Sequence, residues 1–458
     1  MLRNALPASR EARRILVGTL FSAIGRGLTL PFLYVYLTQV RGLEPGTVGL
    51  LVGWMGVVAL VLAPIGGSLV DRFGARRVVL PLLVVEAAGT GSLAFVDSAF
   101  SAFIALSVVA IGFAALWSGQ TTILASLVDP GERQRVFGLS FTLLNLGIGL
   151  GGVISGTIVD ATRPASFQTV YLGDAVSYLV PAVILLSMPH VGRRLAKETV
   201  TVDGNAKGGY AQVLRDGSFV RFFLFGLALT TFGYAQIEVG FTAFSTEVAN
   251  VAPRVLGWAF AGNTLLIVVA QLFVVRWLEG RSRTRALAAV GLIFALSWAV
   301  LAGAGLAGSY ALPILASVGV VACSVIFAMG ETLMSPVMPA ITNALATDEL
   351  RGRYNAIGSM VWGLSGIVGP VAAGPLIGAG RATTWVMLVV GGCLLASALA
   401  LRLHHRLTPA QDGRAPATAA SPRPAATPSA PPAVYPAANP AVGDGCRGAV
   451  PEGAAVAP

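Results

Sequence analysis

Long apolar segments alternate with short polar connections along most of the chain. Each segment runs for about 18 to 27 residues with few charges, which is enough helix to cross a hydrocarbon core of roughly 30 Å. Twelve such segments are predicted: 15–39, 46–70, 78–96, 100–125, 136–159, 166–188, 219–244, 255–278, 286–307, 311–335, 355–378 and 382–401. The first has no small-residue cleavage site and is too long for a signal peptide, so we expect it to remain as the first helix.

A polar interruption divides the twelve segments into six and six. We assign residues 1–188 to an N-terminal bundle, 189–218 to a cytoplasmic linker and 219–403 to a C-terminal bundle. The halves show a weak repeat, in which Arg133 corresponds to Arg351 and Gly151 to Gly369. Residues 404–458 are rich in Pro, Ala, Thr and Ser, and we predict a disordered cytoplasmic tail. The pattern predicts an all-α integral membrane protein with two pseudo-symmetric six-helix bundles.

Composition and charge placement agree with a membrane protein. The chain is 55% hydrophobic and 11% charged, against roughly 25% charged in soluble proteins. Its formal net charge of +10 comes from arginines that gather on alternate connections, as in the groups at 10–14, 72–77, 133–135, 193–194, 281–285, 351–353 and 402–406. An excess of basic residues marks cytoplasmic loops, so both termini are predicted to be cytoplasmic. The positive charge therefore orients the chain, and no nucleic-acid partner is expected.

Other chemistry is sparse. Cys323 and Cys393 lie in apolar segments and Cys446 in the tail, so no disulfide framework is indicated. The three histidines, at 190, 404 and 405, sit at or beyond segment ends, so we expect no metal site. The sequence shows nothing resembling a nucleophile triad or a phosphate-binding loop, and its Gly-x-Gly strings follow no strand. We expect neither an enzyme nor a cofactor.

The connection between the second and third segments carries a distinctive motif. It reads Gly67-Ser-Leu-Val-Asp71-Arg72-Phe-Gly74-Ala-Arg76-Arg77. This pattern resembles motif A of the major facilitator superfamily (MFS). A tight cytoplasmic loop collects arginines in any case, but orientation alone requires neither the Asp-Arg pair nor the spaced glycines. The resemblance implies a transporter whose two repeats alternate access to a central site. It also implies that Asp71 and Arg72 latch the cytoplasmic ends of helices 2 and 11; solvated loop charges are the alternative.

The fifth segment carries a second resemblance. It reads Asn145-Leu-Gly147-Ile-Gly149-Leu-Gly151-Gly152-Val-Ile-Ser155-Gly156, and the eleventh carries Gly366-Ile-Val-Gly369-Pro370-Val-Ala-Ala-Gly374. The fifth resembles motif C of the drug/proton antiporter branch, with Gly152 in place of its proline. Small residues also let membrane helices approach closely, so packing is an alternative explanation. The arginine that this branch places in helix 4 is missing here, which puts the usual proton relay in doubt.

Four carboxylates lie within apolar segments, Glu86, Asp174, Glu238 and Glu331, and Arg26 is the only arginine deep within one. Each carboxylate costs about 2.5–3.5 kcal/mol at the bilayer centre unless it is paired or hydrated. The resemblance implies that helices 1, 4, 7 and 10 line the cavity, which selects Arg26, Glu238 and Glu331. Our hypothesis is that the two glutamates alternate between a proton and a cationic substrate while Arg26 tunes one of them. A fixed Arg26–Glu238 pair is the alternative. We expect Asp174 to form a polar clasp near its helix end, and the role of Glu86 stays open.

Further polar or aromatic residues are predicted to face the same cavity. They are Tyr34, Gln120, Asn145, Tyr234, Gln236 and Trp362, although such aromatics often serve packing alone. The favoured function is proton-coupled efflux of a drug-like or metabolite substrate. Import of a nutrient such as a sugar is the alternative, and a membrane receptor or scaffold that signals through the tail is a third. The expected partners are a small-molecule substrate, protons and the lipid bilayer, and the chain is expected to act as a monomer.

Overall fold

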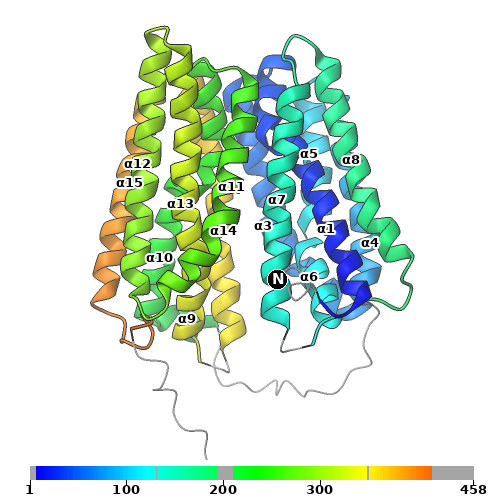
Figure 1. Ribbon diagram of the computed structural model, residues 1–458, viewed down its shortest axis with the longest axis vertical. Coiled ribbons are helices and arrows are strands. Elements are labelled where there is room, and N and C mark those ends of the chain that lie inside the picture. The colour runs from blue at the N-terminus through cyan, green and yellow to red at the C-terminus, as the bar shows by residue number, and fades with distance from the viewer. Residues whose placement is uncertain (1–6, 115, 130–131, 193–209, 348–349, 415–458) are drawn as a thin grey trace, which may run out of the picture. The chain divides into compact units, whose positions relative to one another are not determined.

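The apolar segments form long helices that run back and forth between two ends (Figure 1). The computed structural model describes residues 7–114, 116–129, 132–192, 210–347 and 350–414. The first half comprises α1 (Arg10–Thr29), η2 (Leu30–Phe32), α2 (Leu33–Val35), η3 (Tyr36–Val40), α3 (Pro45–Phe73), α4 (Ala75–Leu93), α5 (Ala99–Ala114), α6 (Leu116–Ser126), α7 (Arg133–Ile158) and α8 (Pro164–Leu186). Within the described ranges there is no β-strand.

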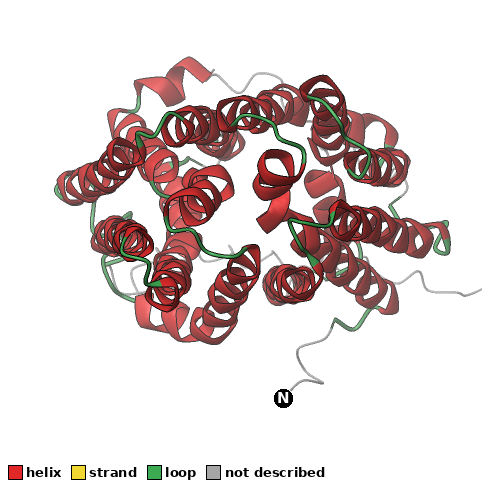
Figure 2. Ribbon diagram, turned by 90° about the horizontal axis from the view of Figure 1, so that it is seen from above, coloured by secondary structure: helices red, strands yellow, loops and turns green. Residues whose placement is uncertain are grey.

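The second half repeats this plan after a short connecting helix. It comprises α9 (Tyr210–Arg215), α10 (Gly217–Phe232), η4 (Tyr234–Gln236), η5 (Ile237–Phe241), η6 (Phe244–Val248), α11 (Pro253–Leu278), α12 (Arg283–Ser309), α13 (Pro313–Leu345), α14 (Arg351–Gly378) and α15 (Ala382–His404). The central part of the predicted linker, 193–209, lies outside the described residues, as does the tail from residue 415. Seen end-on, the long helices stand side by side (Figure 2).

Eleven helices in the described part are long and apolar enough to cross a membrane. The one predicted segment outside these eleven, 78–96, forms α4. This helix is long enough to cross a membrane, but it carries the charged residues Arg76, Arg77 and Glu86. The first two lie at its end, and Glu86 is buried between neighbouring helices. The predicted segment 311–335 extends instead to Leu345, because α13 continues through Pro336 and Pro339. Membrane helices tolerate proline where neighbouring groups satisfy the freed carbonyls.

The first helix of each half is interrupted near the middle of the molecule. In the first half, Pro31 lies in the 3₁₀ turn η2, and a π-helical turn, η3, follows. Proline lacks the N–H that a regular helix needs, which explains the break. In the second half, Gly233 precedes the 3₁₀ turn η4, and two π-helical turns follow. Such irregular turns are frequent at functional sites.

We call the end of the helices that carries residues 71–77 the arginine-rich end, and the other the opposite end. At the opposite end, the two halves are in direct contact. A Cβ on Gly374 would lie 2.5 Å from the Pro45 carbonyl oxygen, and one on Gly257 would lie 2.6 Å from the Gly152 carbonyl oxygen. The first contact joins α14 to α3 and the second joins α11 to α7. The halves are therefore closed against each other at this end.

A short segment after α15 folds back onto the arginine-rich end. Although residues 404–458 are predicted as a disordered tail, residues 405–414 pack against the start of α12. Fully buried Asp412 accepts hydrogen bonds from the Thr284 N–H at 2.8 Å, the Thr284 hydroxyl at 2.8 Å and the Ser282 hydroxyl at 2.7 Å. Arg414 pairs with it at 2.7 Å. A carboxylate at a helix N-terminus is stabilised by unpaired N–H groups and the helix dipole.

Replacing Asp412 by alanine is expected to release residues 405–414. Burial raises the pKa of Asp412, but hydrogen bonds from Ser282 and Thr284 and the charge of Arg414 outweigh burial and hold the pKa below its ordinary value. A depressed folded-state pKa gives stability that is present at neutral pH and lost as the pH falls below about 4. We expect Asp412→Ala to cost about 1–3 kcal/mol locally and to speed proteolysis after Leu407. Exposed Asp129→Asn is the control, and equal proteolysis of both variants would contradict this role.

Candidate functional site

Arg26 lies where three cavities meet. The central cavity, about 490 Å³, is bordered by Arg26, Glu86, Asp174 and Glu238. The Glu331 cavity, about 350 Å³, is bordered by Arg26, Glu238 and Glu331. The Gln120 cavity, about 240 Å³, extends from Arg26 along α1 and α6 toward the arginine-rich end. The central cavity takes its lining from both halves, because α14 and η5 complete it from the second half.

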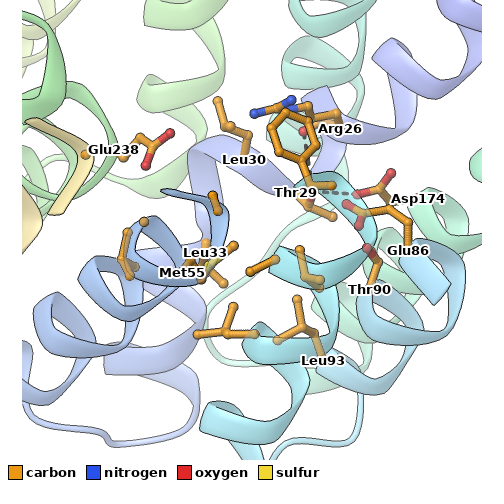
Figure 3. Close-up of a pocket in the computed structure, with 18 of the residues that line it drawn as sticks. Arg26, Thr29, Leu30, Leu33, Met55, Glu86, Thr90, Leu93, Asp174 and Glu238 are labelled. Carbon is orange, nitrogen blue, oxygen red and sulfur yellow. Dashed lines mark hydrogen bonds between the residues drawn. The ribbon is translucent and has the colours of Figure 1, made fainter. Parts of the chain in front are cut away.

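The wall from the first half holds two buried carboxyl groups. Figure 3 shows Glu86 on α4 and Asp174 on α8 close together, with Thr29 reaching Asp174. Each of the two carboxyl-bearing residues is 2% exposed. The Thr29 hydroxyl donates to Asp174 at 2.7 Å, and the Ser177 hydroxyl donates to it at 3.3 Å. Asp174 therefore forms a polar clasp, but the clasp lies in the middle of α8 and borders the cavity, so its predicted place near the helix end was wrong.

The wall from the second half carries the two predicted glutamates. Glu238, in the π-helical turn η5, is exposed to both the central and the Glu331 cavities. Glu331, on α13, accepts a hydrogen bond from the Tyr234 hydroxyl at 2.9 Å. The Tyr234 ring stands edge-on against Trp362, with centroids 5.0 Å apart. The break at Gly233 thus brings Tyr234 and Glu238, which follow it in the same helix, to the Glu331 cavity.

Arg26 contacts an aromatic ring and no carboxylate. Its guanidinium carbon lies 4.4 Å from the centre of the Phe113 ring, a cation–π geometry. Among the described residues, no carboxylate oxygen lies within 4.0 Å of its guanidinium nitrogens. Glu86 and Asp174 stand on one side of it and Glu238 on the other in the view of Figure 3. The alternative of a fixed Arg26–Glu238 ion pair therefore does not describe this structure.

The other predicted cavity residues divide into two groups. Tyr34 borders the central cavity, Asn145 the Glu331 cavity, and Gln120 the cavity of that name. Gln236 lies elsewhere: it is 3% exposed, accepts from the Trp385 indole N–H at 2.9 Å and donates to the Thr231 carbonyl at 2.8 Å. The 3₁₀ turn η4 directs this side chain into the second bundle, so its assignment to the cavity is corrected.

The motif A connection is a tight turn between α3 and α4. Gly74 ends α3 with φ of 86°, a conformation that side chains other than glycine rarely adopt. Arg76 donates to the Leu185 and Met188 carbonyls at the end of α8, which is a common way for a cation to satisfy the last carbonyls of a helix. Gly67 has open space around it, and Arg72 and Arg77 are exposed. The Asp71 side chain lies outside the described residues, so the predicted latch stays a prediction.

The motif C-like glycines face two different neighbours. A Cβ on Gly147 would lie 2.5 Å from Ala23, and one on Gly151 would overlap the Ile24 carbonyl, both on α1. Gly152 and Gly156 instead face Gly257 of α11 in the other half. In α14, a Cβ on Gly369 would lie 2.8 Å from Ala235, and Pro370 packs against Gly49. All these residues serve close helix packing, whichever function they also have.

Glu247 could not be recognised as a site residue from the sequence pattern. It lies beyond the predicted segment 219–244, in the π-helical turn η6, and accepts a short hydrogen bond from the Tyr34 hydroxyl. This bond joins the first helix of one half to the first helix of the other near the opposite end. Tyr34 is 1% exposed and borders the central cavity. The bond therefore adds to the contacts that close the two halves against each other at the opposite end.

Tyr34→Phe and Glu247→Gln are each expected to loosen this closure. A hydrogen bond to a charged group contributes about 1.5–3 kcal/mol, so amide hydrogen exchange in residues 36–44 and 244–252 should accelerate about tenfold or more. The double variant should exchange no faster than Tyr34→Phe, because Tyr34→Phe removes the bond and Glu247→Gln only weakens it by replacing a charged acceptor with a neutral one. Tyr310→Phe, at the same end and exposed, is the control. Unchanged exchange in both single variants would contradict a closing role for the bond.

Comparison with known proteins identifies the family. The sequence profile of the Major Facilitator Superfamily matches residues 15–253 and 239–439. The chain belongs to the major facilitator superfamily. It is therefore a multi-pass membrane protein and a secondary transporter, not an enzyme.

Individual MFS relatives are distant in sequence. The chain is 25% identical over 404 residues to the multidrug resistance protein MdtH of Yersinia enterocolitica. The alignment covers 86% of this chain and 94% of the relative. The chain is 22% identical over 387 residues to the uncharacterized MFS-type transporter YqjV of Bacillus subtilis, covering 83% and 90%. A solved POT family transporter in complex with 5-aminolevulinic acid superposes with a TM-score of 0.71 at 16% identity, covering 88% and 99%. This last likeness concerns the fold alone.

Proposed function

We propose that this MFS member is a proton-coupled exporter of amphipathic cations, which include drug-like molecules or metabolites. It would act as a monomer in the cytoplasmic membrane, with both termini in the cytoplasm. One observation carries the proposal: Arg26, which pairs with no carboxylate among the described residues, borders cavities that Glu238 and Glu331 also border. A cation that enters such a cavity competes with protons for the same carboxylates, and this competition couples the two movements.

The walls of the cavity support an amphipathic substrate. Beside its charged groups, the lining of the central cavity includes the apolar residues Leu30, Leu33, Val52, Met55, Val109 and Phe113. Aromatic faces and carboxylates together favour cations over neutral sugars, which need many hydrogen-bonding partners. The name of the MdtH relatives, multidrug resistance protein, also supports export. Exchange of one proton for one monovalent cation moves no net charge, so the pH gradient drives it; with more than one proton per cation, the membrane potential adds about 2.3 kcal/mol per net charge per 100 mV.

A substrate screen in liposomes with an imposed pH gradient tests this function. In liposomes that contain the wild-type protein, we expect lipophilic cations such as tetraphenylphosphonium to move in the direction opposite to the flow of protons down their gradient. Glu331→Gln should lose proton coupling and bind the cation roughly tenfold or more weakly, because one charge-assisted contact is lost. Transport of sugars but not cations would favour the import alternative. Absence of proton-coupled movement of every compound would contradict the proposal.

A further inference from the structure

The first-half wall of the central cavity contains chemistry that Glu238 and Glu331 do not explain. Glu86 and Asp174 are both 2% exposed, yet they come from α4 and α8, which are separated by 88 positions in the chain, and both border one cavity. One oxygen of Glu86, Oε2, is buried and has no hydrogen-bond partner among the described residues. Buried carboxylate oxygens are normally satisfied, so this exception needs a physical explanation.

Close packing holds this pair in place. A Cβ on Gly112 of α5 would overlap Glu86 Oε2 and lie 2.8 Å from the Glu86 backbone nitrogen. A Cβ on Gly25 of α1 would lie 2.5 Å from Asp174 Oδ1. Two glycines on different helices therefore leave the space that the two carboxyl groups occupy. Thr29 and Ser177 supply donors to Asp174, while Glu86 Oε2 is left for a proton or a cavity water.

The charges around the pair favour one bound proton. The titratable or charged groups that face Glu86 are Arg26 on α1 and Asp174 and Tyr178 on α8. The sides that α3, α5 and α6 turn toward the cavity add no charged residue among those described. Two carboxylates and one guanidinium carry a net charge of −1, and a single proton makes the group neutral. A low-dielectric site favours the neutral state, because like charges in close proximity do not both stay ionised.

We propose that Glu86 and Asp174 share one proton and form a second proton site, in the first half, that Arg26 controls. The inference deepens the proposed function and rests on it for its role in transport. When the guanidinium of Arg26 moves from the Phe113 ring toward the pair, both carboxylates become ionised. The O–H bond on the shared proton then breaks, and the proton passes to water in the central cavity. Glu238, on the facing wall, stays free for the cation.

The inference is tested without any transport measurement. Purified wild-type protein in detergent is treated with dicyclohexylcarbodiimide, an apolar reagent that modifies protonated carboxyl groups, and the adducts are located by mass spectrometry. We expect labelling at Glu86 or Asp174 at neutral pH, and its loss in mildly alkaline buffer. Labelling only at Glu238 or Glu331, or no labelling of any of the four, overturns the proposal. Because the folded wild-type chain is used, failure of a variant to fold does not affect this outcome.

Infrared difference spectra between mildly acidic and mildly alkaline buffer provide the second readout. The same component of the wild-type carboxylic C=O band should vanish in both Glu86→Gln and Asp174→Asn, because the two side chains share the proton, whereas any component from Glu238 or Glu331 should remain. Arg26→Gln should move the loss of the band to higher pH. Asp160→Asn is the control: hydrogen bonds from Thr162 and Arg163 lower the pKa of exposed Asp160 to about 2, so it stays ionised throughout. A carboxylic C=O band that is the same in both pair variants as in the wild type overturns the inference.

These readouts separate the inference from the proposed function. If liposomes show no cation transport but the shared proton is found, the exporter proposal fails and the proton site stands. If cation–proton exchange occurs but neither readout finds a proton on this pair, the exporter proposal stands and coupling belongs to Glu238 and Glu331 alone.

Discussion

An Arg26→Gln variant is expected to reach the membrane and to lose at least about 99% of its pH-driven cation transport. Among the described residues that line the three cavities, Arg26 is the one positive charge, and it faces Glu86, Asp174 and Glu238 together. A charge interaction of about 2.7 kcal/mol corresponds to a hundredfold change in rate, because each 1.36 kcal/mol is a factor of ten. Without the guanidinium, the carboxyl groups keep their protons and cannot exchange them for a cation.

The control for this prediction is Arg163→Gln. Arg163 is 76% exposed at the opposite end and pairs only with Asp160, three residues away, so its loss should leave transport unchanged. The measurement is uptake of tetraphenylphosphonium into liposomes under an imposed pH gradient, corrected for the amount of protein inserted. Arg26→Gln with the transport rate of Arg163→Gln would exclude Arg26 from the mechanism.

Gly151→Ala is expected to destabilise the protein strongly, whereas Gly138→Ala on the same helix should not. A Cβ at position 151 would overlap the Ile24 carbonyl and lie 2.8 Å from the Gly27 carbonyl carbon, so backbone atoms of α1 must move. Overpacking of this kind costs about 1–3 kcal/mol, and occasionally more. A Cβ at position 138 meets nothing within 4 Å, so alanine there should be neutral or stabilise the helix by about 0.5–1 kcal/mol.

Thermal unfolding in detergent, monitored by size-exclusion chromatography, gives melting temperatures that compare the two alanine variants directly. The same substitution on one helix removes differences in helix propensity, and only the neighbouring α1 backbone distinguishes the sites. Equal melting temperatures would contradict the packing role assigned to the motif C-like glycines. A stable Gly151→Ala variant with impaired transport would instead favour the antiporter role that the resemblance implies.

Much of the fold follows from the sequence because the membrane imposes simple rules. Segments long enough to cross a bilayer must be helical, since lipid offers no partners to unpaired backbone groups. All twelve predicted segments form helices. They include 78–96, which forms α4 with Arg76 and Arg77 at its start and Glu86 buried. The bounds of 311–335 were wrong at Pro336, because proline stops an isolated helix but not one whose neighbours satisfy its carbonyls.

The charged residues of the candidate site were predictable from the sequence, but the directions in which individual side chains point were less predictable. Arg26, Glu238 and Glu331 share cavities, as expected for charges that the bilayer would otherwise exclude. Gln236 was misplaced because the sequence does not reveal the 3₁₀ turn at 234–236, which rotates side chains by about 120° per residue instead of about 100°. Glu247 was missed because the helix extends by a π-helical turn beyond its apolar segment.

Distances between spin labels at the two ends test the central claim, that the two halves alternate around the charged cavities. One label pair is placed at Arg133 and Arg285 of the arginine-rich end and another at Arg163 and Tyr310 of the opposite end. All four positions are exposed, and Cys323 and Cys393 are buried; Cys446→Ser removes the remaining thiol. Adding tetraphenylphosphonium or changing the pH should shorten the first distance and lengthen the second. Distances that stay fixed, or that change in the same direction, would contradict alternating access.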